Sequence, residues 1–284
     1  MEFKTKYLSP DIKLSLYDDA LFKTETAFDH HMLVWFISGE TKIVLAEGNY
    51  VFGPGDIFLI PRNQLATIIN YPKDGRPHKT VAMHLTTPRL RKFYEKHQPV
   101  CQQLSHLEDI RKFGNHPLLE SCLSSLMPYF DLKEALPGNI ESIKIEEAIS
   151  ILRIIDPGID GLLSNFEEPG KINIVDFMEK NFMFNMTLEK FGYLTGRSLA
   201  TFRRDFSKSF NTTPQKWLTQ KRLALAHYYL VQKQQKPIDV YLEVGFEDLS
   251  HFSFAFKKQF GYPPTGISHV SGDLTNSIPG INNF

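Results

Sequence analysis

The stretch TFRRDFSKSF at Thr201–Phe210 has a counterpart fifty residues later, HFSFAFKKQF at His251–Phe260. Each copy places phenylalanine at every fourth position, with basic residues between the rings. Together with Leu199 and Leu249, spacings of three and four residues put the apolar side chains on one face of a helix. The pattern predicts two amphipathic helices with basic outer faces. Taken alone, the phenylalanines fit two ordinary core helices equally well.

A short apolar segment ending in glycine precedes each copy. MTLEKFGYLTG at Met186–Gly196 and PIDVYLEVGF at Pro237–Phe246 have the length and composition of short helices, the second ending at Gly245. Ser198 and Asp248 are suited to N-cap the helices that follow. A helix, a glycine turn and a second helix with a basic outer face form the helix-turn-helix arrangement. Finding this arrangement twice in one chain makes the helix-turn-helix assignment far more specific than finding it once.

The segment between the copies, PQKWLTQKRLALAHYYLV at Pro214–Val231, predicts a single helix with Pro214 at its first position. Its 18 residues would span about 27 Å, whereas successive major-groove faces lie roughly 34 Å apart. One rigid helix could therefore hold two recognition helices near neighbouring turns of a duplex, with bent DNA or an imperfect fit making up the difference.

The 284 residues are enough for two compact domains. Residues 171–284 carry 14 basic and 9 acidic side chains, and residues 1–170 carry 18 and 23. The excess of basic over acidic side chains in residues 171–284 fits a DNA-facing half or a solvated surface equally well. No apolar run approaches the roughly 18 residues of a membrane span, no leader opens the sequence, and Cys101 and Cys122 suggest reduced thiols. We therefore expect a cytoplasmic protein without membrane association.

The first ninety residues have the pattern of short strands. Runs such as HMLVWFIS at His31–Ser38 alternate with Gly, Pro, Asn and Asp at intervals of about ten residues, which predicts a β-sandwich or barrel. The acidic segment SNFEEPGK at Ser164–Lys171 is the best candidate linker. We therefore expect a β-rich domain at 1–165, a helical domain at 172–268 and a loose tail at 269–284.

A helix is predicted between the strands and the linker. IESIKIEEAISILRII at Ile140–Ile155 is apolar over more than a narrow stripe. Packing on two sides, on the β-rich domain and on a partner subunit, explains this pattern. A core helix of a monomer explains it equally well.

The second copy and its surroundings, DVYLEVGFEDLSHFSFAFKKQFGYPP at Asp239–Pro264, resemble the signature of AraC-type transcriptional regulators. The segment Met186–Leu230 resembles the matching half of the same tandem domain. The resemblance covers Ile172–Ser268. It implies a seven-helix domain with two recognition helices, acting as a dimeric transcriptional activator on promoter DNA together with RNA polymerase, without a cofactor.

The resemblance also implies which side chains face the groove. The family's usual positions correspond to Ala200, Arg203 and Arg204 in the first helix and to Ser250, His251 and Phe254 in the second. The predicted DNA-binding set further includes Ser198, Thr201, Lys208, Lys257 and Lys258. We expect the two arginines to contact guanines and Phe254 to contact a thymine methyl group.

Three positions depart from the family's pattern. Gly192 and Tyr241 stand where a small alanine is expected, and Asn211 stands where glycine is common after the first recognition helix. These departures concern helix packing and leave the motif intact.

The N-terminal half resembles a cupin barrel in GDIFLIPRNQLATIIN, where Gly55, Pro61 and Asn70 fit the cupin spacing. Asn63 and Ala66 stand where the second glycine and the metal-binding histidine belong. The sequence thus indicates an α+β protein with a cupin-like barrel, dimerisation helices and a helical DNA-binding domain.

Histidines elsewhere do not restore a metal site in this prediction. His30 and His31 are adjacent, and neighbours on a strand point to opposite faces. With His84 they are expected to be structural or exposed, so we expect a protein that is not an enzyme and holds no metal. A cupin-type metalloenzyme with a helical appendage is the main alternative, and an interaction adaptor is a second.

AraC-type proteins commonly pair such a barrel with dimerisation helices, which implies effector binding and dimerisation for residues 1–165. The barrel segments and the helix around Lys144–Ile155 are most similar to a subgroup that includes regulators of type III secretion, some of which respond to a protein partner. No constellation of polar residues in the sequence identifies a ligand. The effector is a small apolar or sugar-like molecule or a protein partner, or the barrel holds nothing, and its binding residues stay unassigned.

Overall fold

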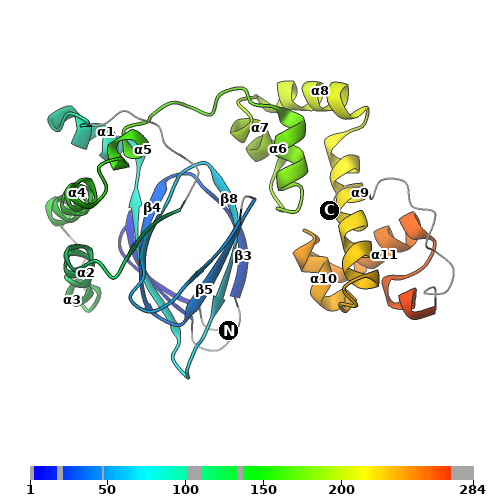
Figure 1. Cartoon of the computed structure of the whole chain (residues 1–284), viewed down its shortest axis with the longest axis horizontal. Coiled ribbons are helices and arrows are strands. Elements are labelled where there is room, and N and C mark those ends of the chain that lie inside the picture. The colour runs from blue at the N-terminus through cyan, green and yellow to red at the C-terminus, as the bar shows by residue number, and fades with distance from the viewer. Residues whose placement is uncertain (1–2, 18–21, 47, 101–109, 133–136, 270–284) are drawn as a thin grey trace. The chain divides into compact units, whose positions relative to one another are not determined.

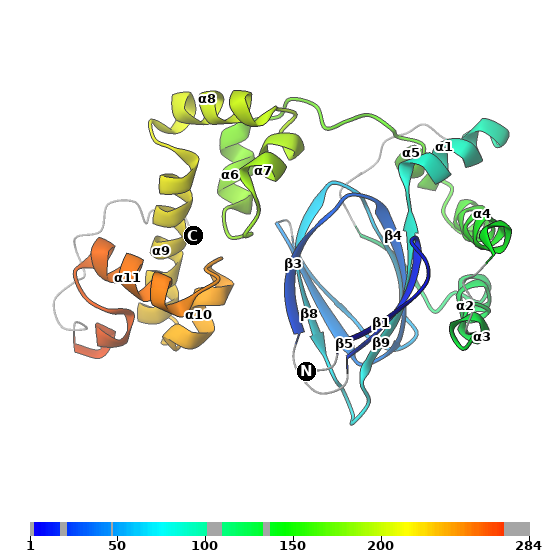
Figure 2. The ribbon, with the colours of Figure 1, turned by 180° about the vertical axis from the view of Figure 1, so that it is seen from behind.

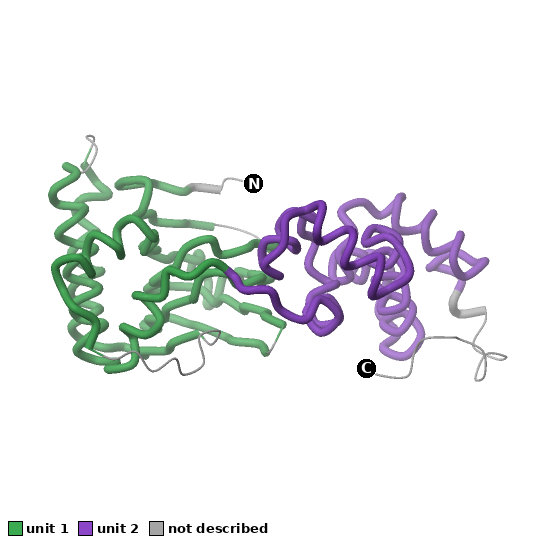
Figure 3. The backbone as a smooth tube through the Cα atoms, turned by 90° about the horizontal axis from the view of Figure 1, so that it is seen from above, with its two compact units in different colours: residues 1–168 green, residues 169–284 purple. Residues whose placement is uncertain are grey.

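The computed structural model describes residues 3–17, 22–46, 48–100, 110–132 and 137–269. The chain divides into two compact units, residues 1–168 and 169–284 (Figure 3). The first is rich in strands and the second is helical, which confirms the two-part α+β class. The division falls inside the expected linker, Ser164–Lys171. Cys101 and residues 270–284 of the expected tail lie outside the described residues.

Two antiparallel sheets form the body of unit 1 (Figure 1). The six-stranded sheet has the order β1-β2-β9-β4-β7-β10, and the four-stranded sheet has the order β3-β8-β5-β6. The strands are β1 Phe3–Ser9, β2 Ile12–Tyr17, β3 Phe22–Phe28, β4 His31–Ser38, β5 Glu40–Leu45, β6 Gly48–Phe52, β7 Ile57–Ile60, β8 Gln64–Tyr71, β9 His78–Leu85 and β10 Arg111–Gly114.

The two sheets enclose one apolar core between them. Along β5, every second residue is buried, as the period of a strand with one core-facing side requires. Phe36 and Phe58 from the six-stranded sheet meet Ile43 and Phe52 from the four-stranded sheet. The rings of Phe52 and Phe58 stack with centroids 3.6 Å apart. The predicted strand-rich first ninety residues are thereby confirmed.

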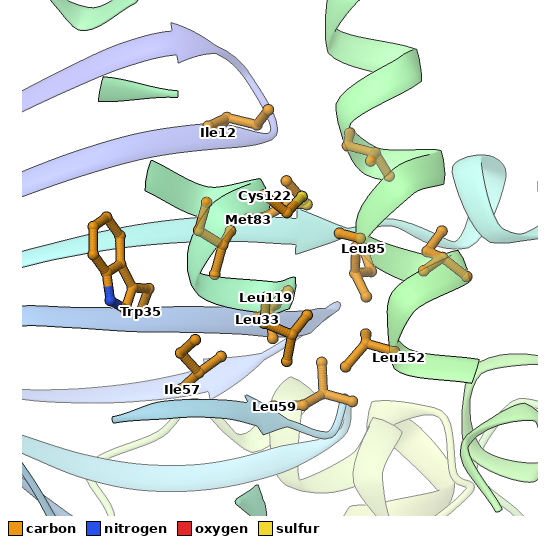
Figure 4. Close-up of a cluster of buried hydrophobic side chains, with 14 of the residues drawn as sticks. Ile12, Leu33, Trp35, Ile57, Leu59, Met83, Leu85, Leu119, Cys122 and Leu152 are labelled. Carbon is orange, nitrogen blue, oxygen red and sulfur yellow. The ribbon is translucent and has the colours of Figure 1, made fainter. Parts of the chain in front are cut away.

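The outer face of the six-stranded sheet packs on helices. These are α1 Thr87–Lys96, α2 Pro117–Ser124, α3 Met127–Phe130, α4 Gly138–Ile155 and α5 Ile159–Leu163. Leu33, Leu59 and Met83 from the sheet form one cluster with Leu119 of α2 and Leu152 of α4 (Figure 4). Because β4 is covered on both faces, its sequence is a nearly continuous apolar run and not an alternating one.

Helix α4 confirms the predicted helix and divides its apolar residues between two faces. Ile145, Ile149 and Leu152 are buried in the core of unit 1. Ile143 and Ile154 point away from it, with 59% and 71% of their surface exposed. The segment is rich in isoleucine because the helix has a second apolar face. The described residues of the chain leave this face uncovered.

The first residues of the expected linker are held against unit 1 by two arginines. Arg62 Nη2 donates to the carbonyl oxygens of Asn165, at 3.1 Å, and of Glu167, at 2.6 Å. The guanidinium of Arg91 lies 4.5 Å from the ring centre of Phe166. Residues 165–167 are therefore part of unit 1, and free chain can begin only beyond them.

Unit 2 is built from helices around one long central helix. They are α6 Ile174–Asn181, α7 Leu188–Leu194, α8 Leu199–Phe210, α9 Pro214–Val231, α10 Pro237–Glu243 and α11 Leu249–Phe260, followed by a 3-10 helix, Pro264–His269. Helix α9 has the predicted bounds, and Pro214 occupies its first turn. It contacts α8 towards one end and α11 towards the other (Figure 2). None of the described helices is both long enough and apolar enough to cross a bilayer.

We predict that Arg62→Ala frees residues 165–168 for proteolysis. Hydrogen bonds from a charged donor contribute about 1.5–3 kcal/mol each, so losing two should speed local cleavage about tenfold or more. A glutamate-specific protease acting after Glu167 and Glu168 measures this rate. Arg76→Ala, at an exposed hairpin of the same unit, is the control and should leave the rate unchanged. Equal rates for Arg62→Ala and the unaltered chain would contradict the assignment.

Candidate nucleic-acid interface

Unit 2 contains two helix-turn-helix pairs, α7 with α8 and α10 with α11. The turns use Gly196 at φ 66° and Gly245 at φ 86°, a left-handed conformation that glycine adopts without strain. Both turns are also crowded. A Cβ at Gly196 would lie 2.4 Å from the carbonyl oxygen of Gly170, and one at Gly245 would lie 2.7 Å from that of Met183. Glycine is therefore required at both turns for two independent reasons.

The second helix of each pair begins at the predicted cap. The Ser198 hydroxyl accepts from the Thr201 N–H at 3.3 Å, and the Asp248 carboxylate accepts from the His251 N–H at 2.6 Å. Each bond satisfies a backbone donor that the first turn of a helix leaves unpaired. The capping predictions for Ser198 and Asp248 are confirmed.

The departures from the family pattern fit the local geometry. Asn211 ends α8 at φ 52° and Gly261 ends α11 at φ 85°, so the two occupy equivalent left-handed caps. Asparagine tolerates this region better than most residues. A Cβ at Gly192 would lie 3.1 Å from the Arg197 carbonyl oxygen, which explains a residue smaller than alanine there. Tyr241 is half-buried on α10.

Both phenylalanine stripes face inwards, as the spacing predicts. Phe202 and Phe206 of α8, and Phe252 and Phe256 of α11, are fully buried. This burial turns the intervening residues of both helices to the outside. The two ten-residue copies are therefore the same structural element, each with an apolar inner face and a polar outer one.

The outer face of α8 exposes most of the predicted DNA-binding residues of the first copy. Ala200, Arg203, Arg204 and Lys208 are exposed, and their spacing of three and four residues places them on one side of the helix. Ser198 is exposed at the cap. We name this set, with half-buried Thr201, the α8 face. Its role in DNA binding stays a prediction.

Arg204 extends from the α8 face with 75% of its side chain exposed. Its nearest acid is Asp205, at 3.4 Å. Asp205 also pairs with Arg197 at 3.1 Å and with Lys171 at 3.4 Å, and these contacts, led by the hydrogen bond from Arg197, lower the pKa of its carboxyl group. Because Asp205 keeps two other cations, Arg204 can turn to another anion at little cost.

The outer face of α11 has a different character. Ser250, His251, Phe254, Lys257 and Lys258 are all exposed, and we name them the α11 face. Phe254 has 69% of its surface exposed. It stands fifty residues after Arg204, so it occupies the same helix position in the second copy. An apolar ring thus replaces a guanidinium at an equivalent place. The role of the α11 face in DNA binding also stays a prediction.

The three histidines that were expected to be structural or exposed all lie in unit 1. His31 is 2% exposed, and its Nδ1 accepts from the Arg62 N–H at 3.2 Å. Burial, with Arg62 and His30 nearby, lowers its pKa to about 3. His31 is therefore neutral and structural. His30 and His84 are half-buried. Within the described residues, no group of three or more His, Cys, Asp or Glu side chains could hold a metal ion.

A polar constellation that could not be recognised in the sequence lies between the two sheets. A cavity of about 510 Å³, counting the open space at its mouth, lies between the sheets. Its polar lining comes from four strands and comprises Lys13, Ser15, Tyr17, Thr41, Asn70, His78 and Thr80. The only signal in the sequence was polar residues at every second position of β2 and β9, at 13, 15 and 17 and at 78 and 80.

Three of these residues are joined by hydrogen bonds, although the buried Nδ1 of His78 has no hydrogen-bond partner among the described residues. Thr41 Oγ1 lies 2.6 Å from Asn70 Oδ1 and 2.8 Å from His78 Nε2. A hydroxyl has one proton, so Thr41 donates to Asn70 and accepts from Nε2–H of His78. Burial lowers the pKa of His78 to about 4, which keeps the ring neutral.

Comparison with known proteins identifies two matched domains. Residues 31–154 match the family model described as ExsA N-terminal regulatory domain, and residues 194–268 match the one described as Helix-turn-helix domain. Together these ranges cover more than half of the chain. The chain is 21% identical to the HTH-type transcriptional regulator ExsA of Pseudomonas aeruginosa over 235 residues, which are 81% of this chain and 82% of that protein.

A second relative is the virulence regulon transcriptional activator VirF of Yersinia enterocolitica. It is 25% identical over 155 residues, which are 54% of this chain and only 57% of VirF. Among solved structures, apo ToxT from Vibrio cholerae aligns over 90% of this chain and 96% of its own, with 11% identity and a TM-score of 0.45. From its two matched domains and its relatives, the chain belongs to the AraC-type family of DNA-binding transcriptional regulators.

Proposed function

We propose that this chain activates transcription by binding promoter DNA as a homodimer, with α8 and α11 each entering a major groove and with RNA polymerase as a further partner. The observation that carries the proposal is the pair of outward faces on equivalent helices, both exposed and both holding basic residues. No catalytic role is assigned to any residue. We take unit 2 as the seven-helix domain of the family, counting its 3-10 helix.

On the α8 face, Arg203 and Arg204 are the candidates for base readout. A guanidinium can donate two hydrogen bonds to O6 and N7 of guanine, which is the most common specific contact in the major groove. Both arginines are exposed, and Arg204 is held only by a long contact to Asp205. Lys208, one turn further along, is placed to meet a phosphate.

On the α11 face, Phe254 is the candidate for base readout and the lysines are candidates for phosphate contacts. A phenyl ring has no hydrogen-bonding group, and in the major groove its natural partner is the C5-methyl group of thymine. Because 69% of the surface of Phe254 is exposed, its contact with water is unfavourable and a binding partner can reach the ring. Lys257 and Lys258 follow it in the last turn of the helix.

For unit 1 we propose a cupin-like regulatory barrel that responds to an effector or a protein partner and dimerises through the outer face of α4. Ile143 and Ile154 on that face are separated by eleven residues, or about three turns, so they lie on one line along the helix. Two large apolar side chains exposed on one line favour a helix-to-helix contact with a second copy.

Arg204→Ala should relax sequence preference, whereas Lys257→Ala should weaken binding to all sequences alike. Loss of a bidentate guanine contact costs about 1–3 kcal/mol of discrimination, or roughly a tenfold to hundredfold change, at one base pair. Loss of a phosphate contact lowers the slope of log K against log salt by about one. Fluorescence anisotropy on variant duplexes at several salt concentrations measures both. Equal, non-selective losses for the two variants would contradict this division of roles.

A thymine contact by Phe254 predicts sensitivity to a single methyl group. Replacing the contacted thymine by uracil removes one methyl and should weaken binding about fourfold, since a buried methyl group contributes about 0.8 kcal/mol. Phe254→Ala should bind thymine and uracil duplexes equally. Arg204→Ala is the control and should keep the preference for thymine. If no thymine in the footprint shows this pattern, Phe254 does not read a methyl group.

Replacing Ile143 and Ile154 together by glutamate should dissociate the dimer. Two charges at the centre of an apolar contact should raise the dimer dissociation constant by about tenfold or more. Sedimentation velocity over a range of concentrations measures it. Lys92→Glu, on the exposed side of α1, also adds negative charge to unit 1 and serves as the control. An unchanged dissociation constant in the double variant rules out this face.

A further inference from the structure

The chain enters unit 2 along the first helix-turn-helix pair. Residues 170–172, which we name the entry segment, pass over the turn at Gly196, where an added Cβ would lie 2.4 Å from the carbonyl oxygen of Gly170. Arg197 Nη1 donates to the carbonyl oxygen of Ile172 at 3.0 Å. Close backbone contact and a charge-assisted hydrogen bond thus hold the entry segment on the pair formed by α7 and α8.

Asp205 joins the entry segment to α8. Its carboxylate accepts from Arg197 Nε at 3.1 Å and lies 3.4 Å from Lys171 Nζ. An α-helix turns by about 100° per residue, so Asp205 lies about 60° around α8 from Lys208 and about 100° from Arg204. Lys171 is therefore held beside the α8 face, although it precedes α6 in the chain.

The residues that make this connection are not repeated in the second copy. Ala255 stands fifty residues after Asp205, and Glu247 stands fifty residues after Arg197. The same copy has Phe254 in place of an arginine. The fold of a helix-turn-helix pair therefore does not require the acid, which is present only beside the recognition helix that holds a guanidinium. This distribution indicates that the acid serves the first recognition helix in binding.

Three cations surround this one carboxylate. Arg197 has only 7% of its side chain exposed, whereas Lys171 and Arg204 have 62% and 75% exposed. The hydrogen bond from Arg197 is the first of the contacts that lower the pKa of Asp205, so the acid stays ionised. One negative charge cannot compensate three positive ones. Because an exposed ion pair contributes little, the ammonium group of Lys171 can bind a further anion.

We propose that the entry segment is part of the DNA interface, with Lys171 contacting a backbone phosphate beside the base that Arg204 is proposed to read and Asp205 acting as the residue that positions it. An ammonium group has three N–H donors, so it can stay on Asp205 and donate to a phosphate at the same time. A phosphate contact carries no sequence information, so Lys171 adds affinity without changing sequence preference. The inference rests on the function proposed for the α8 face, and it adds a residue that the predicted DNA-binding set does not contain.

Lysine acetylation followed by mass spectrometry tests this contact on the full chain without any substitution. The chain is labelled alone and together with a duplex that it has selected from random sequences. The duplex should reduce the labelling of Lys171 to the same extent as that of Lys208, Lys257 and Lys258, because a lysine that contacts a phosphate is shielded from the reagent. Lys92, in unit 1, is the internal control and should be labelled equally in both samples.

The outcomes separate this inference from the proposed function. Protection of Lys171 together with the other three lysines supports both. Protection of Lys208, Lys257 and Lys258 without protection of Lys171 overturns the inference and leaves the proposed function standing. Absence of protection at all four lysines overturns both.

Lys171→Met removes the charge at an exposed position and should lower the slope of log K against log salt by about one. The ranking of different duplex sequences should stay as in the unaltered chain. Fluorescence anisotropy at several salt concentrations measures both. Lys92→Met removes the same charge from unit 1 and is the matched control, with no expected change in slope. An unchanged slope in Lys171→Met, or a changed ranking of sequences, overturns the phosphate contact.

Substitution of Asp205 separates positioning from simple charge repulsion. If the acid only repels DNA, Asp205→Asn strengthens binding, and Lys171→Met changes the slope equally with and without it. If Asp205 positions the lysine, Lys171→Met has little effect on the slope in the Asp205→Asn chain. Asp205→Glu keeps the carboxylate and should restore the effect of Lys171→Met. Equal effects of Lys171→Met in all three chains overturn the positioning role.

Discussion

Helix α9 fixes the positions of both recognition helices, because it places one aromatic side chain in each phenylalanine stripe. Trp217 lies 5.6 Å from the ring centre of Phe206 and 4.7 Å from that of Phe210. Ten residues later, His227 lies 4.7 Å from Phe260 and bonds to the Tyr262 hydroxyl at 2.7 Å. An α-helix sets these two anchors about 15 Å apart along its axis and about 80° apart around it. The arrangement of the two readers is thereby determined by one rigid element.

Arg222, halfway between the anchors, joins the two halves directly. It donates to the carbonyl oxygens of Phe182 and Phe184, which follow α6, and of Gly245, in the second turn. Three charge-assisted bonds to backbone carbonyls make independent motion of the two helix-turn-helix pairs costly. Within this shared frame the copies differ on their outer faces, where Arg204 and Phe254 occupy equivalent positions. Under the roles proposed for these residues, one half would read hydrogen-bonding edges while the other would read a methyl group.

Sequence reasoning succeeded where the determinants are local. Ser198, Asp248 and Pro214 act within one helical turn, so their roles could be predicted from neighbours in the chain. The strand β10 could not be predicted, because Arg111–Gly114 becomes a strand only by pairing with β7, which lies more than fifty residues earlier. The cavity could not be predicted from the sequence for the same reason. Its polar residues lie on four strands of two sheets, and only the register of those strands brings them together between the sheets.

The cavity and the segment that leaves unit 1 are linked through the end of β7. Ile60 lines the cavity, and Arg62, two residues later, holds Asn165 and Glu167. The Arg62 N–H donates to His31 Nδ1, which can accept only while the imidazole is neutral. Burial keeps it neutral by lowering the pKa of His31 to about 3, so this bond persists at any pH at which the cell lives. The lining of the cavity and the contact that holds residues 165–167 are therefore separated by a single residue of the chain, Pro61.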